Sequence, residues 1–487
     1  MPMPSEKEEL WRYSPIDELR LDDFIPQSGG AAGDLGPVGA AFVAGIAADM
    51  TSHAALVTTV DGSPVAFDRH ALPDGVYVGS LLLLDPDAGD TTGDEGGEAE
   101  LQGREAAHLI GGLLTEVDPM VRLNDAFHPD AVVVDVPPGV IVDAPIIVVH
   151  WCTNAGPGEG SGNPAIFPRT IVRVGRGASA QVVEVVAGAP DATMELVVPV
   201  TELVAGDGSQ LSYVVLQVLG TKVWHIARLA AVAGRDATLR TFTVGLGGAY
   251  DRSRTDALAQ GQGSTTELRS AYLGTGTQVH DVRTLQDHAA PHTTSDLLCK
   301  GAVAGASRSI YSGLIRVRRG AVRTNAFQTN HNLVLNEGAH ADSVPNLDIE
   351  ENDVRCSHAS TVGPVDEDQR YYLESRGIPP ARAEQLIVLG FFEDIVQRSP
   401  VPALVPRLRS EVGLRLADAL ALDLELGFGG TGTTVPPQGV GKDEDDAEDK
   451  DEDKDEDKEE DEDKDEDKDE DKEEDEDKDE EKEEDDG

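Results

Sequence analysis

The segment NLDIEENDVRCSHASTVG carries two side chains whose types and spacing suit metal binding. Cys356 and His358 are two positions apart, so a β-strand would place both side chains on one face. A thiolate beside an imidazole forms a site for a soft or borderline metal ion. The pair alone is a weak signal, because a free cysteine is commonly just a small buried hydrophobic residue. The motif leaves metal binding and simple packing both open.

A second candidate metal site is the segment HDVRTLQDHAAPH, which contains His280, His288 and His292 and precedes Cys299. Imidazoles are good ligands for iron or zinc. However, the spacing bridges a turn instead of following one helix face, and surface histidines are common. Structural or solvated roles are therefore the favoured interpretation, with metal binding as the alternative.

Several motifs of nucleotide and metal chemistry are missing from the sequence. There is no G-x-x-x-x-G-K-[ST], no H-E-x-x-H and no C-x-x-C. We therefore expect a chain that neither hydrolyses ATP nor holds a whole iron–sulfur cluster with its own cysteines. The three cysteines, Cys152, Cys299 and Cys356, are far apart and odd in number. A disulfide framework is not expected, and a reducing compartment fits best.

The charge of the chain is strongly negative, at −51. About 35 acidic residues and about 9 lysines lie from Lys442 onward. Nucleic acid and anionic membranes attract clustered positive charge, so neither is an expected partner. The N-terminus MPMPSEKEEL lacks the features of a secretory signal, and the apolar stretch from Val38 to Ala48 is too short to span a bilayer. These features predict a cytoplasmic protein.

Composition divides the chain into four regions. Residues 1–125 are predicted to be α-helical or irregular, and residues 126–365 a β-rich core. Residues 366–426 are predicted to be helical, and residues 427–487 a linker with a disordered acidic DEDK tail. The tail is expected to be merely solvated, with weak binding of divalent cations as the alternative.

The core contains many short runs of β-branched residues, each preceded by a turn with glycine. The turns near positions 177, 207, 234 and 263 recur at intervals of about 27 to 30 residues. No long amphipathic helix interrupts them, so a βαβ sheet is disfavoured. Polar residues in the later strands (Thr324, Asn325, Gln328 and Asn330) favour a β-solenoid, in which they can stack between coils, over a β-sandwich.

The helical region has clear boundary signals. Asp366 can cap the helix DEDQRYYLESRGI, and Gly377 can end it. Pro379 and Pro380 stand at the start of the next helix, where the missing N–H costs little. Because so few helices are present, we expect an apolar helical face to remain available for a partner.

The C-terminal part of the core and the helices after it resemble the SufB/SufD family of iron–sulfur cluster assembly proteins. The resemblance rests on YSGLIRVRRGAVRTNAFQTNHNLVLNEGAHADSVPNLDIEENDVRCSHASTVGPVDEDQRYYLESRGI and on LGFFEDIV after it. Upstream, LNDAFHPDAVVVDVPPGVIVDAPIIVVHW and ELWRYSPIDEL are also similar to the family. The likeness covers most of residues 8–420 and does not include the tail.

Two positions indicate the SufD branch of the family. Its members carry C-S-H followed by a small residue and a threonine, which Cys356 to Thr361 match. Ala359 replaces the glycine that is common there. The SufB branch places a sulfur-accepting cysteine before the R-G-I motif, where this chain has Leu373.

The resemblance implies a right-handed parallel β-helix with helical segments at both ends and no enzymatic activity. It implies pairing with SufB through the β-helix and docking of the ATPase SufC on the C-terminal helical region. His358 would be an iron-handling residue or ligand that faces a SufB cysteine, with Cys356 as an auxiliary thiol. The iron–sulfur cluster or iron would be held transiently at that interface. A SufB-like sulfur acceptor and a carbohydrate-active β-helix enzyme are the alternatives.

Overall fold

The computed structural model describes residues 4–27, 34–50, 52–84, 108–114, 118–153, 162–189 and 193–420. All of them belong to one compact unit, Met1–Gly432. The linker and acidic tail expected at 427–487 lie outside the described residues. Within these ranges, no helix has the length and apolar character needed to cross a membrane.

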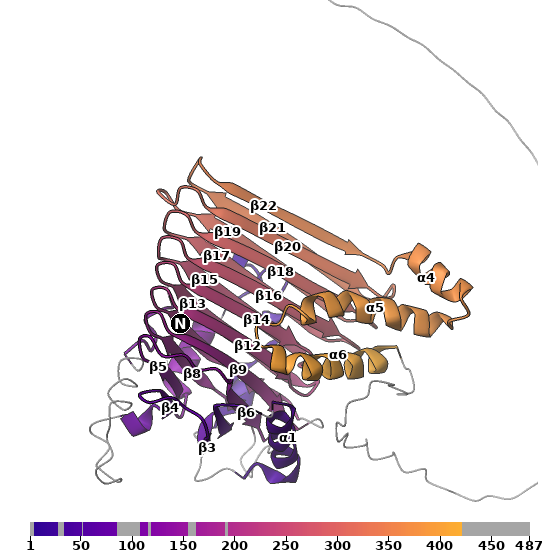
Figure 1. The fold of residues 1–487 in the computed structure, drawn as a ribbon. Coiled ribbons are helices and arrows are strands. Elements are labelled where there is room, and N and C mark those ends of the chain that lie inside the picture. The colour runs from indigo at the N-terminus through magenta and orange to yellow at the C-terminus, as the bar shows by residue number, and fades with distance from the viewer. Residues whose placement is uncertain are drawn as a thin grey trace, which may run out of the picture. The chain divides into compact units, whose positions relative to one another are not determined.

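Two sheets of mostly parallel strands form the body of this unit, and along the core the chain passes from one sheet to the other and back (Figure 1). In spatial order, the main path of the first sheet is β21 (His340–Ile349), β19 (Arg308–Val317), β17 (Val279–His288), β15 (Tyr250–Ala259), β13 (Val223–Ala233), β11 (Val200–Ala205), β8 (Arg169–Val174), β5 (Val132–Val136) and β4 (Tyr77–Ser80). That of the second sheet is β22 (Arg355–Gly363), β20 (Asn325–Val334), β18 (Thr294–Val303), β16 (Thr265–Gly274), β14 (Thr238–Gly245), β12 (Gln210–Val218), β9 (Ser179–Gly188), β6 (Ile146–Cys152), β2 (Ala55–Val60) and β3 (Ser63–Arg69). The short strands β1 (Phe24–Pro26), β7 (Asn163–Ile166) and β10 (Glu195–Val197) join the first sheet. This arrangement confirms the expected parallel β-solenoid, and the sandwich alternative is wrong.

Turns that contain glycine connect the coils, as the sequence spacing predicted. Gly177, Gly208 and Gly263 have φ values of 67°, 66° and 76°, in the left-handed region that glycine adopts without a steric penalty. Gly261 is restricted by close packing instead. A Cβ atom there would lie 2.0 Å from the backbone nitrogen of Arg235, in the turn of the preceding coil. The turns of successive coils are therefore in close backbone contact at Gly261.

The solenoid interior changes from apolar to polar along the chain. Valines such as Val134 and Val148, from opposite sheets, share one buried cluster in the N-terminal coils. In the C-terminal coils Thr324, Gln328 and Asn330 are buried instead. Thr324 lies 3.1 Å from Thr293 of the preceding coil, between the two hydroxyl oxygens. Polar side chains thus do stack between coils, which is the feature that favoured a solenoid.

The N-terminal region differs from its prediction as α-helical or irregular. It contains the helix α1 (Gly36–Asp49), but β2, β3 and β4 also extend both sheets. Strand β2 has the sequence ALVTTV, is buried throughout and pairs in parallel with β6. Because β-branched residues fit a pleated, buried surface, this run forms a strand once β6 offers an edge. The prediction was wrong for these strands.

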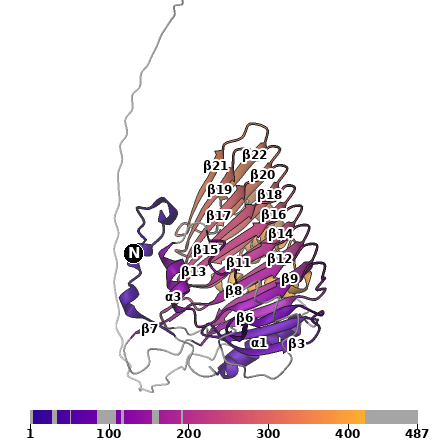
Figure 2. The same cartoon turned by 90° about the vertical axis from the view of Figure 1, so that its left-hand side faces the viewer.

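Other N-terminal segments cover the outer side of the first sheet (Figure 2). The helix α3 (Pro119–Phe127) is capped by Asp118, which accepts a hydrogen bond from the Val121 amide at 2.9 Å. Trp11 is buried there, and the Arg252 guanidinium lies 4.0 Å from its ring centroid.

Short 3-10 helices also occur in the described chain: η1 (Glu9–Trp11), η2 (Ile16–Glu18), η3 (Leu21–Asp23), η4 (Leu82–Leu84) and η5 (Pro402–Leu404).

Three C-terminal helices follow the solenoid: α4 (Glu367–Ser375), α5 (Pro380–Val396) and α6 (Val405–Ala419). Asp366 caps α4 by accepting hydrogen bonds from two backbone amides, and Gly377 ends it with φ 86°, as predicted. The apolar faces of α5 and α6 pack on the second sheet, with Phe392 and Leu416 in one cluster with Val244 (Figure 1). The expectation of a free apolar face was therefore wrong for these two helices, because the solenoid itself covers that face.

Candidate functional site

Strand β22 carries both Cys356 and His358 at the end of the second sheet. Its register with β20 aligns Cys356 with Ala326 and His358 with Gln328. Ala326 and Gln328 are buried in the solenoid, so the aligned side chains on β22 lie on the interior side of the last coil. No later strand covers this coil among the described residues. We call this end of the solenoid, formed by β21 and β22, the open end.

Cys356 and His358 differ in their surroundings at the open end. Cys356 is half-buried and packs against a cluster that includes Ile315 and Ala326, whereas His358 is exposed. Burial raises the pKa of the Cys356 thiol above its usual value, and a backbone hydrogen bond involving Ala326 lowers it in part. The thiol is therefore mostly protonated at neutral pH in the isolated chain. A metal ion would displace this proton, because the thiolate is the species that coordinates.

Buried amides below the open end lack partners within the part of the chain that the structure describes. They are Nε2 and Oε1 of Gln328 and Nδ2 of Asn330. Gln328 reaches across the interior to β19, where a Cβ on Gly313 would lie 2.3 Å from its Nε2. An unpartnered buried amide costs about 1–3 kcal/mol, so water or a bound group at this end would be stabilising.

A chain of hydrogen bonds links the interior to the open end. The Tyr272 hydroxyl donates to Asn332 Oδ1, and Asn332 Nδ2 donates to Asn330 Oδ1 at 2.7 Å. The Ser343 hydroxyl donates to the same Asn330 oxygen at 2.8 Å, and Ser360 donates to Ser343 at 2.7 Å. Ser360 is on the same face of β22 as His358, two residues away. The candidate site thus rests on a polar interior instead of an apolar one.

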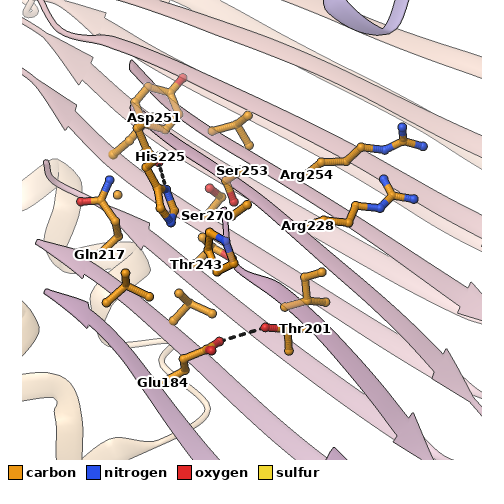
Figure 3. Close-up of a pocket in the computed structure, with 18 of the residues that line it drawn as sticks. Glu184, Thr201, Gln217, His225, Arg228, Thr243, Asp251, Ser253, Arg254 and Ser270 are labelled. Carbon is orange, nitrogen blue, oxygen red and sulfur yellow. Dashed lines mark hydrogen bonds and ion pairs between the residues drawn. The ribbon is translucent and has the colours of Figure 1, made fainter. Parts of the chain in front are cut away.

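Deeper in the solenoid, a pocket is lined by ionisable side chains from both sheets (Figure 3). Asp251 lies between two histidines, 2.7 Å from His225 Nδ1 and 3.0 Å from His280 Nδ1. Burial alone would raise the pKa of Asp251, but the two histidine hydrogen bonds outweigh it and hold the pKa well below its usual range. No local sequence pattern indicates this arrangement, because His225 and Asp251 come from different coils.

The structure separates the histidines of the second candidate site. His280 bonds to Asp251, which lines the pocket, and His288 lies at the other end of the same strand. His288 bonds to Thr293 and Ser295, both at 2.8 Å, and burial lowers its pKa to about 4, so it is neutral at neutral pH. His292 occupies a turn with φ 59°. Structural roles, the favoured interpretation, account for His280 and His288.

Cys299 and Cys152 are both buried and unpaired. Burial raises the pKa of Cys299 to about 12 and that of Cys152 well above its usual value. Neither thiol is therefore reactive, which leaves Cys356 as the accessible cysteine of the three.

The fold and the site together define a β-solenoid protein that presents a thiol and an imidazole at the open end, beyond which the described residues add no further strand. A family model described as SUF system FeS cluster assembly, SufBD core domain, matches residues 157–391. The chain belongs to the SufB/SufD family, which acts in SUF iron–sulfur cluster assembly.

Several relatives agree with this membership. A SufBD family protein of Mycobacterium tuberculosis is 38% identical over 242 residues, which are 48% of this chain and 59% of that protein. The iron–sulfur cluster assembly protein SufD of Escherichia coli is 28% identical over 414 residues, 85% of this chain and 89% of that protein. SufD of Bacillus subtilis is 31% identical over 215 residues, 44% and 49% of the two chains. The match thus spans about three fifths of the mycobacterial relative.

Proposed function

We propose that the chain is a SufD-like, non-enzymatic subunit of a SufB–SufC–SufD scaffold, and that it supplies a ligand for the nascent iron–sulfur cluster at its interface with SufB. The observation that carries the proposal is the open end. It places an exposed imidazole and a half-buried thiol on β22, the last strand of the second sheet among the described residues. Membership of the SufB/SufD family and the similarity to two SufD proteins support it.

The open end has the physical character of a subunit interface. Among the described residues, β21 and β22 are the last strands of their sheets, so one edge of each offers backbone groups that a partner strand can bond. Large apolar side chains are exposed on or beside them: Phe327 (41%), Leu347 (40%), Ile349 (40%) and Val362 (44%). A second solenoid that docks edge to edge would cover these side chains and satisfy the backbone.

The ligand chemistry also favours an interface. His358 and Cys356 supply two ligands at most, which is too few for a whole cluster, since such clusters commonly need four. The remaining ligands would come from the partner subunit, with His358 as the principal group on this side and Cys356 as the auxiliary one. A cluster held across two subunits becomes labile when their interface opens, which suits a scaffold that must release its product. The same site would take up iron for assembly.

The C-terminal helices are the proposed docking region for SufC. The apolar faces of α5 and α6 are occupied by the sheet, whereas α4 exposes Tyr371 (73%) and Tyr372 (56%). Exposed tyrosines are common anchors in protein interfaces. Since the sequence lacks a phosphate-binding loop, the ATPase activity would reside in that partner. We therefore assign the SufC contact to α4 and its surroundings.

Co-expression with SufB and SufC homologues tests the proposed assembly. We expect one stable complex of all three chains by mass measurement. Val362→Asp, which puts a charge on the exposed edge strand, should weaken assembly with SufB at least about tenfold, because an unpaired charge would be buried. Leu83→Asp is the matched control, since Leu83 is exposed and lies in η4 near the opposite end of the fold. Equal assembly of both variants would contradict the proposed interface.

The alternative of a SufB-like sulfur acceptor makes a different prediction for the thiol. It requires a stable persulfide on Cys356, which peptide mass spectrometry can detect after incubation with a cysteine desulfurase. The raised pKa of this thiol disfavours that role, because the thiolate is the attacking species.

A further inference from the structure

Three potential metal ligands meet at the end of the solenoid opposite Cys356 and His358. Within the residues that the structure describes, His53, Asp68 and His70 offer ligand atoms that all lie within 4.8 Å of one another. His53 precedes β2, Asp68 lies in β3, and His70 directly follows β3. The antiparallel register of β2 and β3 brings these positions together at the edge of the second sheet (Figure 1).

The hydrogen bond of His53 determines which of its ring nitrogens is free. Nδ1 lies 3.2 Å from the carbonyl oxygen of Met50. A carbonyl can only accept, so Nδ1 donates and carries the proton, and the lone pair of the neutral ring is on Nε2. Nε2 is buried and has no hydrogen-bond partner among the described residues. A metal ion would satisfy this atom, and the Met50 carbonyl holds the ring in the tautomer that binds metal.

The other two ligands are close and free to adjust. Nε2 of His70 lies 2.7 Å from Oδ2 of Asp68, and the rings of His53 and His70 are 5.6 Å apart between centroids. The backbone amides of His70 and Ala71 both donate to the Ala54 carbonyl at 3.1 Å, which fixes the segment beside His53. Since Asp68 and His70 are exposed, their side chains can rotate toward His53 at little cost.

We propose that His53, Asp68 and His70 bind a divalent first-row transition-metal ion, such as Fe²⁺ or Zn²⁺, through two imidazole nitrogens and one carboxylate oxygen. This donor set favours these ions over Mg²⁺ and Ca²⁺, which prefer all-oxygen sites. Metal–ligand bonds are about 2.0–2.2 Å long, so three atoms within 4.8 Å need only small rotations to surround one ion. The bound ion links the edge strand β3 to the start of β2.

Cobalt(II) is the probe for this site, because its visible absorption reports coordination by imidazole. The titration uses the full chain in excess Mg²⁺, which occupies the carboxylates of the acidic tail. We expect one equivalent of Co²⁺ to bind at His53, Asp68 and His70 without the sulfur-to-cobalt charge-transfer band that binding at Cys356 would add, and we expect Zn²⁺ to displace it. His53→Ala and His70→Ala should each weaken binding at least about tenfold. His340→Ala is the matched control, because His340 is exposed and pairs with Asp342 at 3.2 Å, but the described residues form no group of three metal ligands there.

The outcome that overturns the proposal is a full chain without imidazole-type Co²⁺ absorption, or His53→Ala and His70→Ala variants that bind Co²⁺ as tightly as the unmodified chain. Circular dichroism checks that each variant is folded. If a histidine variant does not fold, Asp68→Asn tests the metal site in its place. Asp68 is exposed and this substitution keeps the size of its side chain, so the variant should fold while losing the carboxylate ligand. A tenfold loss in Asp68→Asn supports the site, and unchanged affinity rejects it. The result is independent of complex formation with SufB or SufC.

Discussion

Replacing His358 by alanine is expected to lower iron–sulfur cluster formation by about 10–100-fold or more. Loss of a residue that only orients a metal ligand already costs about 10–100-fold, and loss of the ligand itself should cost at least as much. The SufB–SufC–SufD complex should still assemble, because His358 is exposed and its side chain supports none of the described contacts that hold β22 on β20. The measurement combines cluster absorption of the purified complex with transfer to an apoprotein.

His331→Ala is the matched control for this variant. His331 lies on β20, its register partner on β22 is Thr361, and its ring contacts that hydroxyl at 2.6 Å on the opposite face of the sheet from His358. We expect near-normal cluster formation with this control. Cys356→Ser should reduce cluster formation by less than His358→Ala does, because Cys356 is proposed as the auxiliary ligand and His358 as the principal one. Normal cluster formation with His358→Ala would show that this imidazole is not the ligand.

Arg169→Met is expected to cause a large loss of stability, about 3–5 kcal/mol in the free energy of unfolding. Arg169 is buried on β8 and donates to Glu202 at 2.6 Å, Asp125 at 2.8 Å and Asn124 at 3.0 Å. Its removal leaves the fully buried Glu202 carboxylate without its cation. Urea unfolding at neutral pH, compared with the unmodified chain, gives the difference.

A double variant distinguishes two causes of this loss of stability: the unpaired buried charge of Glu202 and the lost packing of the Arg169 side chain. Arg169→Met with Glu202→Gln removes both charges, so it should recover at least about 1 kcal/mol relative to the single variant. The amide oxygen that Glu202→Gln introduces can still accept one of the backbone bonds that the Glu202 carboxylate receives from Gly111 at 2.8 Å and Leu113 at 3.2 Å. A double variant that is no more stable than Arg169→Met would mean that packing of Arg169, and not its charge, matters here.

The sequence was sufficient where structure depends on local chemistry. The interval between glycine turns predicted the stacked coils, and Asp366 and Gly377 predicted both ends of α4. The two-residue spacing of Cys356 and His358 predicted a shared strand face, which the register with β20 bears out. In each case the decisive residues are neighbours in the chain or recur at a fixed period.

The sequence was insufficient where distant segments meet. His53 and His70 are 17 positions apart and come together only because β2 and β3 form a hairpin. Asp251 meets His225 only through the stacking of two coils. The apolar pattern of α5 in the sequence also did not indicate whether the solenoid or a partner protein would cover that face. These contacts depend on the register of the sheets, which no local pattern encodes.

Reactivity of Cys356 measures directly whether the open end is a subunit interface. In the isolated chain a thiol reagent at mildly alkaline pH should label Cys356 and leave the buried Cys152 and Cys299 unmodified, as peptide mass spectrometry can show. In the assembled complex we expect labelling of Cys356 to fall at least about tenfold, because the partner excludes water and reagent from this end. Equal labelling of Cys356 in the isolated chain and in the complex would contradict the account.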